Sequence, residues 1–154
     1  MLTHMLKVLY PDKKIEIADH WLLDLDGYVM DVAHHGAGPG SRNWLKGNIL
    51  KWYTESLMQD CIDLQEPVPD VVLRAHHHEP IYTRGVHQTG GRVWRTDAFI
   101  TPPFCFIGSH AQKVIRSPGR MSVGMVALEV VNGKLLDWHF FLRTIDLRVR
   151  EIVK

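Results

Sequence analysis

Short segments rich in leucine, β-branched and aromatic residues occur in pairs along this chain, and each pair flanks a turn-forming dipeptide. The dipeptides are Asp26-Gly27, Gly90-Gly91 and Asn132-Gly133. Such dipeptides favour tight turns because their residues accept positive φ angles. The pattern therefore predicts three β-hairpins. We expect a longer loop between Ile81–Arg84 and Arg92–Arg95 than in the other two hairpins.

One segment, Trp44–Ile62, has the apolar spacing of an amphipathic helix. Its apolar residues lie one, three or four positions apart and form a single face. They are Leu45, Ile49, Leu50, Tyr53, Leu57, Met58, Cys61 and Ile62. We expect Ser41 or Asn43 to cap the start of this helix, and Pro67 and Pro69 prevent its continuation.

The order of these elements predicts the fold class. Strands come first, one helix follows, and a short apolar segment, Val71–Ala75, precedes a strand-rich second half. We expect a β-rich α/β fold of mixed strands, built as a two-sheet sandwich with one main helix outside. A strand–helix–strand unit usually makes its two strands parallel and adjacent. Tyr28–Val32 and Val71–Ala75 should therefore end at the same crevice, where ligands bind in open α/β sheets.

Composition narrows the class of protein. The 154 residues fit one domain, 1–154, and 45% hydrophobic with 23% charged residues is typical of a soluble globular protein. A net charge of +1 gives no bulk attraction to nucleic acid or to anionic membranes. No apolar run reaches the length of about 18 residues that a membrane span needs. Cys61 and Cys105 suit reduced thiols, so we expect a cytoplasmic protein.

Five of the ten histidines form two clusters, each directly after a predicted strand. The clusters are His34-His35 and His76-His77-His78. Imidazoles at the ends of neighbouring strands commonly hold a transition metal, with nitrogen–zinc distances of about 2.0–2.1 Å. Because side chains alternate along a strand, His76 and His78 should face the crevice and His77 the opposite side. One imidazole of the first cluster, from either His34 or His35, should turn inward.

The glycine-rich segment after the first cluster has two interpretations. Gly36–Arg42 either binds an anion at the start of the predicted helix, with Arg42 assisting, or simply turns the chain sharply. It is not a nucleotide phosphate loop, because no lysine follows the glycines in register. The two interpretations stay open at this point.

The other reactive or aromatic residues have ordinary structural explanations. We interpret the remaining histidines as surface or hydrogen-bonded residues: His4, His20, His87, His110 and His139. We assign the acidic residues near the first turn to strand and turn positions: Asp24, Asp26 and Asp31. We expect four aromatic residues to lie in the core: Trp52, Trp94, Trp138 and Phe104. No catalytic serine–histidine–carboxylate arrangement follows from the spacing.

The two histidine clusters, with the helix between them, resemble the last two motifs of the calcineurin-like metallophosphoesterases. In that family, a histidine after one strand and both histidines of Gly-His-x-His after the next strand ligate metal. The resemblance implies that His34, with His35 as its substitute, and His76 and His78 are metal ligands. Ala75 stands where the family usually has glycine. The resemblance covers roughly residues 20 to 142.

The upstream half of the family's site is missing. Its motifs Asp-x-His, Gly-Asp and Gly-Asn-His-Asp/Glu do not precede the histidine clusters in this chain. The resemblance therefore implies a partial domain, the C-terminal portion of a metallophosphoesterase fold. A complete site holds two ions, manganese, zinc or iron, about 3.5–4 Å apart. Because an aspartate normally bridges those ions, we expect this chain alone to hold one ion or none.

Two functions of different classes follow. The first is metal-dependent hydrolysis of phosphate mono- or diesters, including nucleotide or nucleic-acid substrates, by a domain that other motifs must complete. The alternative is a non-catalytic remnant of the same fold that binds metal or a partner. Expected partners are a homo-oligomer or a separate chain that carries the missing half. The catalytic residues are not assigned.

Overall fold

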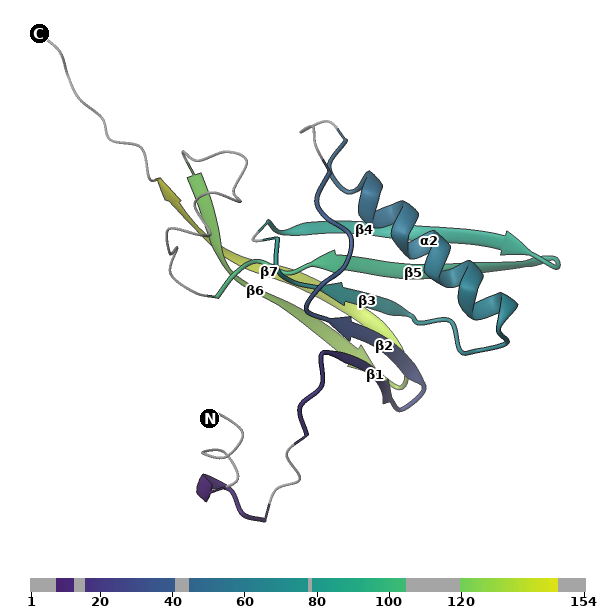
Figure 1. The fold of residues 1–154 in the computed structure, drawn as a ribbon, viewed down its shortest axis with the longest axis horizontal. Coiled ribbons are helices and arrows are strands. Elements are labelled where there is room, and N and C mark those ends of the chain that lie inside the picture. The colour runs from purple at the N-terminus through teal and green to yellow at the C-terminus, as the bar shows by residue number, and fades with distance from the viewer. Residues whose placement is uncertain (1–7, 13–15, 41–44, 78, 105–119, 147–154) are drawn as a thin grey trace, which may run out of the picture.

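The computed structural model describes residues 8–12, 16–40, 45–77, 79–104 and 120–146 (Figure 1). The elements follow one another as β1 (His20–Leu25), β2 (Tyr28–Ala33), α2 (Asn48–Asp63), β3 (Val71–Arg74), β4 (Ile81–Thr89), β5 (Arg92–Ile100), β6 (Arg120–Val131) and β7 (Lys134–Asp146). This is a β-rich α/β arrangement with one long helix in the described residues, as the sequence predicts.

Five strands form a mixed sheet in the order β1-β2-β3-β5-β4, and β6 pairs with β7 in a separate hairpin. Strands β2, β3 and β5 run parallel, while β1 and β4 lie antiparallel at the two edges. The parallel pairing of β2 with β3 confirms the prediction made from the strand–helix–strand order. The carboxyl ends of the parallel strands β2, β3 and β5 therefore lie together. We call this end of the sheet, where these strands finish, its carboxyl edge.

All three predicted hairpin turns are present. Both residues have positive φ at Asp26-Gly27 (56° and 87°), Gly90-Gly91 (56° and 75°) and Asn132-Gly133 (50° and 68°). These angles match two-residue turns whose twist suits the flanking strands. The longer loop expected at Gly90-Gly91 is wrong, because β4 and β5 stay paired up to Thr89 and Arg92.

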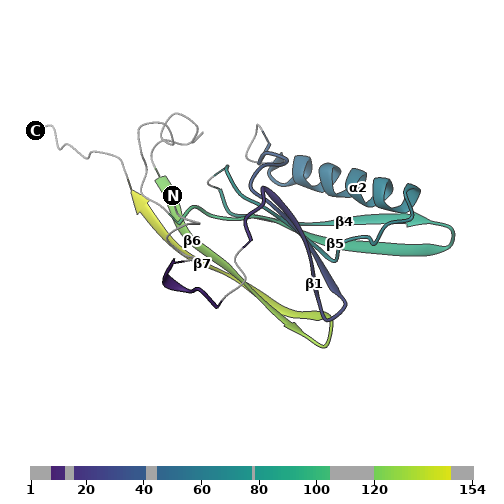
Figure 2. The ribbon, with the colours of Figure 1, turned by 60° about the horizontal axis from the view of Figure 1, so that its bottom comes forward.

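The two faces of the five-stranded sheet are covered by different elements. Helix α2 packs over β4 and β5, and the β6–β7 hairpin lies on the opposite side (Figure 2). On the helix side the buried residues are Leu50, Val72, Ile81, Ala98 and Ile100. On the hairpin side they are Tyr28, Met30, Val71 and Phe99. Alternation along each strand supplies one apolar residue to each face in turn.

Helix α2 begins later than the sequence predicts. It starts at Asn48 rather than Trp44, because Gly47 before it adopts a left-handed conformation with φ 86° that breaks the helical path. Among the described residues no side chain caps the start by a hydrogen bond, and the expected caps Ser41 and Asn43 lie outside those residues. No helix in the described residues is both long and apolar enough to cross a membrane.

The buried face of α2 also differs in detail from the predicted one. Thr54 is fully buried and bonds to the main-chain oxygen of Leu50 at 2.7 Å, whereas the predicted face residue Ile49 is exposed. Cys61 is half-buried, and burial raises the pKa of its thiol, which disfavours the nucleophilic thiolate. The helix therefore packs through a narrower stripe than its apolar pattern indicates.

Two of the four aromatic residues expected in the core are exposed. Trp52 on α2 is 66% exposed and Phe104 is 80% exposed. Trp138 is half-buried and packs against the core, with its ring 4.3 Å from that of Tyr82. Trp94 is half-buried and carries the Arg92 guanidinium 3.5 Å above its ring. Aromatic character alone does not separate these cases, because burial depends on what packs against each face.

Tyr28 provides a stability prediction, because its hydroxyl is buried without a hydrogen-bond partner among the described residues. We expect Tyr28→Phe to raise the free energy of unfolding by about 1 kcal/mol, since an unsatisfied buried hydroxyl is costly. Burial and the carboxylates of Asp97 and Asp70 raise the pKa of this phenol. Above about pH 10 the unfolded chain releases the proton that the folded chain retains, so stability falls as pH rises.

Urea unfolding at pH 7 and at pH 10.5 measures both effects. We expect Tyr28→Phe to lose less stability between the two pH values than the unsubstituted chain does. A variant that is less stable at pH 7 by more than about 1 kcal/mol would show that the hydroxyl has a stabilising partner.

Candidate metal centre

The two histidine clusters follow two neighbouring strands of the sheet, β2 and β3. Ala33 at the end of β2 lies opposite Arg74 at the end of β3. His34 and His35 follow β2 at once, and the main-chain N–H of Ala75 donates to the oxygen of His34 at 3.2 Å. This bond continues the strand pairing one step beyond the sheet. The two clusters therefore begin at neighbouring points of the carboxyl edge.

Three imidazoles converge at this edge. Among the described residues, His34, His35 and His76 place one ligand atom each so that all lie within 4.8 Å of one another. The ring of His76 lies 5.3 Å from that of His34 and 4.4 Å from that of His35, between centroids. All three side chains are exposed.

The spacing of these imidazoles suits a single metal ion. Nitrogen ligands of one tetrahedral zinc ion stand about 3.3 Å apart, given nitrogen–zinc distances of about 2.0–2.1 Å. Binding of one ion would require the ligand atoms, now within 4.8 Å of one another, to move closer together. Three protein ligands with a fourth position open to water or substrate are typical of hydrolytic zinc sites. The donor set therefore fits a zinc-type ion.

The alternation expected along a strand does not extend through the second histidine cluster. Strand β3 ends at Arg74, and His76 adopts a left-handed conformation with φ 70°. The His77 ring lies 5.4 Å from that of His76, and a Cβ atom at Gly38 would lie 3.4 Å from it. The predicted ligand His78 and the predicted anion-binding residue Arg42 both lie outside the described residues.

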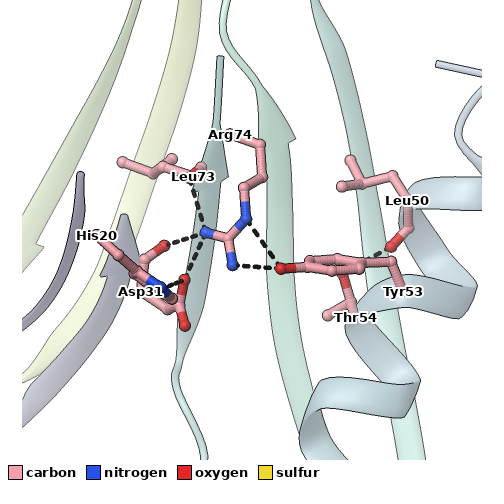
Figure 3. Close-up of polar contacts among 7 residues, drawn as sticks. All are labelled: His20, Asp31, Leu50, Tyr53, Thr54, Leu73 and Arg74. Carbon is pink, nitrogen blue, oxygen red and sulfur yellow. Dashed lines mark hydrogen bonds and ion pairs between the residues drawn. The ribbon is translucent and has the colours of Figure 1, made fainter. Parts of the chain in front are cut away.

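A buried charge network beneath the cluster is absent from the sequence-based predictions (Figure 3). The Arg74 side chain is fully buried and forms an ion pair with the carboxylate of Asp31. Its Nη1 donates to the main-chain oxygens of Asp31 (3.0 Å) and Leu73 (2.9 Å). Its Nε and Nη2 donate to the hydroxyl of Tyr53 on α2, at 3.2 and 2.8 Å. His20 Nε2 lies 2.9 Å from Asp31 Oδ1, the carboxylate oxygen that also pairs with Arg74.

Asp31 is a strand residue, as predicted, but its role in this network was missed. A signal was present in the sequence. Arg74 stands two positions after Val72, so alternation puts both on the same face of β3, where α2 packs. A buried arginine needs an acidic partner, because an unpaired charge in the interior is very costly. Asp31 is the acidic residue that β2 buries on that face.

Comparison with known proteins gives little support for any assignment. No protein-family model matches the sequence, and no curated protein does. Among solved structures, the chain is similar to the solution NMR structure of Thermotoga maritima protein TM1076, a structural-genomics target, at 21% identity and a TM-score of 0.31. The match covers 82% of this chain and 54% of that one, so this chain spans about half of its length. At that TM-score the match supports no statement about fold or function.

Proposed function

We propose that this chain forms the histidine part of a metal-dependent phosphoesterase site, in the C-terminal portion of a metallophosphoesterase-like two-sheet sandwich. The observation that carries the proposal is the convergence of His34, His35 and His76 at the carboxyl ends of two parallel strands. Ligands bind at such edges in open α/β sheets. The resemblance to the metallophosphoesterases adds His78 to this proposed set of ligands.

A divalent ion on these imidazoles would supply the chemistry of hydrolysis. Such an ion polarises a phosphoryl oxygen and generates hydroxide from bound water near neutral pH. The imidazoles of His34, His35 and His76 would hold the ion. Manganese, zinc and iron all accept imidazole nitrogen, and zinc suits a set of three histidines best. The substrate class is a phosphate ester, which includes nucleotides and nucleic acid.

A second ion needs ligands that this cluster lacks. Only histidines make up the group found in the described part of the chain. Neutral imidazoles do not offset the charges of two ions held about 3.5–4 Å apart, so bridging carboxylates must come from elsewhere. A second copy or a separate chain is the expected source. The alternative function, a metal- or partner-binding remnant without catalysis, is favoured by this absence of a carboxylate.

Calorimetric titration tests the proposal. We expect one zinc ion per chain, and we expect inorganic phosphate, the reaction product, to bind the zinc-loaded chain but not the metal-free chain. Manganese binding at two ions per chain, with hydrolysis of bis(p-nitrophenyl) phosphate, would support a complete enzyme. Zinc binding without phosphate binding would favour the non-catalytic alternative. Absence of zinc binding would contradict the metal-dependent site and favour the partner-binding form of the alternative.

A further inference from the structure

Arg74 connects β2 and β3, the two strands that lead into the histidine cluster, with helix α2 (Figure 3). From β3, its guanidinium donates to the main-chain oxygen of Asp31 on β2, to that of the preceding residue Leu73, and to the Tyr53 hydroxyl on α2. A guanidinium presents its N–H groups in fixed directions within one plane. The bonds therefore set the spacing of these three elements at the edge where both histidine clusters begin.

The network is close to both clusters along the chain. Asp31 precedes His34 by three residues, and Arg74 precedes His76 by two. Few rotatable bonds separate the anchored positions from the imidazoles. A shift of either strand end would therefore move the ligand atoms almost directly.

The loop that carries the first cluster also packs on Arg74. A Cβ atom at Gly36 would lie 2.5 Å from Arg74 Cδ and 2.8 Å from its Cγ and Nε. Carbon atoms in favourable contact lie about 3.5–4.0 Å apart, so only glycine allows this approach. Because Asp31 and Tyr53 hold the guanidinium from two sides, Arg74 has little freedom to yield. The loop that follows His35 thus packs through Gly36 directly against the side chain of Arg74.

We propose that Arg74 is a positioning residue that holds the three clustered imidazoles at the spacing one metal ion requires. It acts through the ends of β2 and β3 and through Gly36. The inference rests on the proposed function in that it takes these imidazoles to be the metal ligands. Groups that orient metal ligands from outside the coordination shell typically change metal affinity 10- to 100-fold when altered.

A matched pair of glycine substitutions tests the contact. Gly36→Ala places a methyl group against Arg74, whereas Gly38→Ala, two residues along the same loop, meets only the His77 ring at 3.4 Å. We expect Gly36→Ala to weaken Co²⁺ binding about 10- to 100-fold and to change the intensity of the visible Co²⁺ absorption bands. We expect Gly38→Ala to stay within about threefold of the unsubstituted chain.

Two further variants keep the test decisive if Gly36→Ala does not fold. Arg74→Lys retains the positive charge near Asp31 but loses the planar set of donors to Tyr53 and the two carbonyls. Tyr53→Phe removes only the acceptor on α2. We expect both to weaken Co²⁺ binding about tenfold in chains whose circular dichroism is unchanged. Folded variants with unaltered affinity and unaltered bands would overturn the positioning role.

The failure of this inference is distinguishable from the failure of the proposed function. An unsubstituted chain that binds no Co²⁺ contradicts the metal site itself. In that case the ring NMR signals of His34, His35 and His76 in the metal-free chain show whether Arg74 positions these rings. We expect Arg74→Lys to shift these signals and to leave that of His139 unchanged. Unshifted signals would overturn the inference without reference to any metal.

Discussion

Replacing His76 with alanine should weaken zinc binding at least about 100-fold, the largest functional effect we expect from a single substitution. His76 is the described ligand that comes from the β3 side, and its ring lies within 5.3 Å of both rings of the first cluster. Without His76, only the adjacent imidazoles of His34 and His35 remain as ligands. Both follow β2, so zinc is no longer held from two strands at once. Calorimetric titration with zinc measures the change.

The matched control is His139→Ala. His139 is an exposed strand residue on β7, as predicted, and its ring lies 4.7 Å from that of Phe141. We expect this variant to keep the zinc affinity of the unsubstituted chain. Both substitutions lie on the surface, so each should change the free energy of unfolding by less than about 1 kcal/mol. Equal zinc affinity in the His76 and His139 variants would remove His76 from the metal site.

Asp31→Ala should lower the free energy of unfolding by about 3–5 kcal/mol, the largest stability effect we expect. The substitution leaves the fully buried guanidinium of Arg74 without its counter-charge. The bonds to the main-chain oxygens and to Tyr53 remain, but neutral acceptors do not balance a buried positive charge. Urea denaturation monitored by circular dichroism measures the loss.

His20→Ala is the control for this second substitution. His20 contacts the same carboxylate oxygen as Arg74 does, but its side chain is 56% exposed. Interactions of exposed charged groups contribute about 0–1 kcal/mol, so we expect a loss within that range. If the Asp31 and His20 variants lost the same small amount of stability, the buried ion pair would not be a main support of the strand ends.

The turns of this protein are predictable because they depend on neighbouring residues alone. Asp26-Gly27, Gly90-Gly91 and Asn132-Gly133 adopt positive φ at both positions because these residues tolerate that conformation locally. The parallel pairing of β2 and β3 is predictable for a similar reason. A single helical connection between two strands leaves few ways to return to the sheet.

The packing of α2 was predictable only in part. Its apolar spacing gives the correct type of element, but the helix begins at Asn48 because Gly47 turns left-handed in front of it. The exposure of Trp52 and the burial of Thr54 follow from which side of the helix meets β4 and β5. Apolar periodicity describes a face without stating how much of that face another element covers.

The sequence by itself determined the hairpins, the order of the strands around one helix, and the placement of two histidine clusters at strand ends. These features depend on the local conformational preferences of a few consecutive residues and on the handedness of short connections. The tertiary structure decided that both His34 and His35, rather than one of them, meet His76, and that Asp31 neutralises Arg74. Those contacts depend on the backbone after Arg74 leaving the strand and on the register of β2 against β3. Such relations between distant residues arise only when the sheet and α2 pack together.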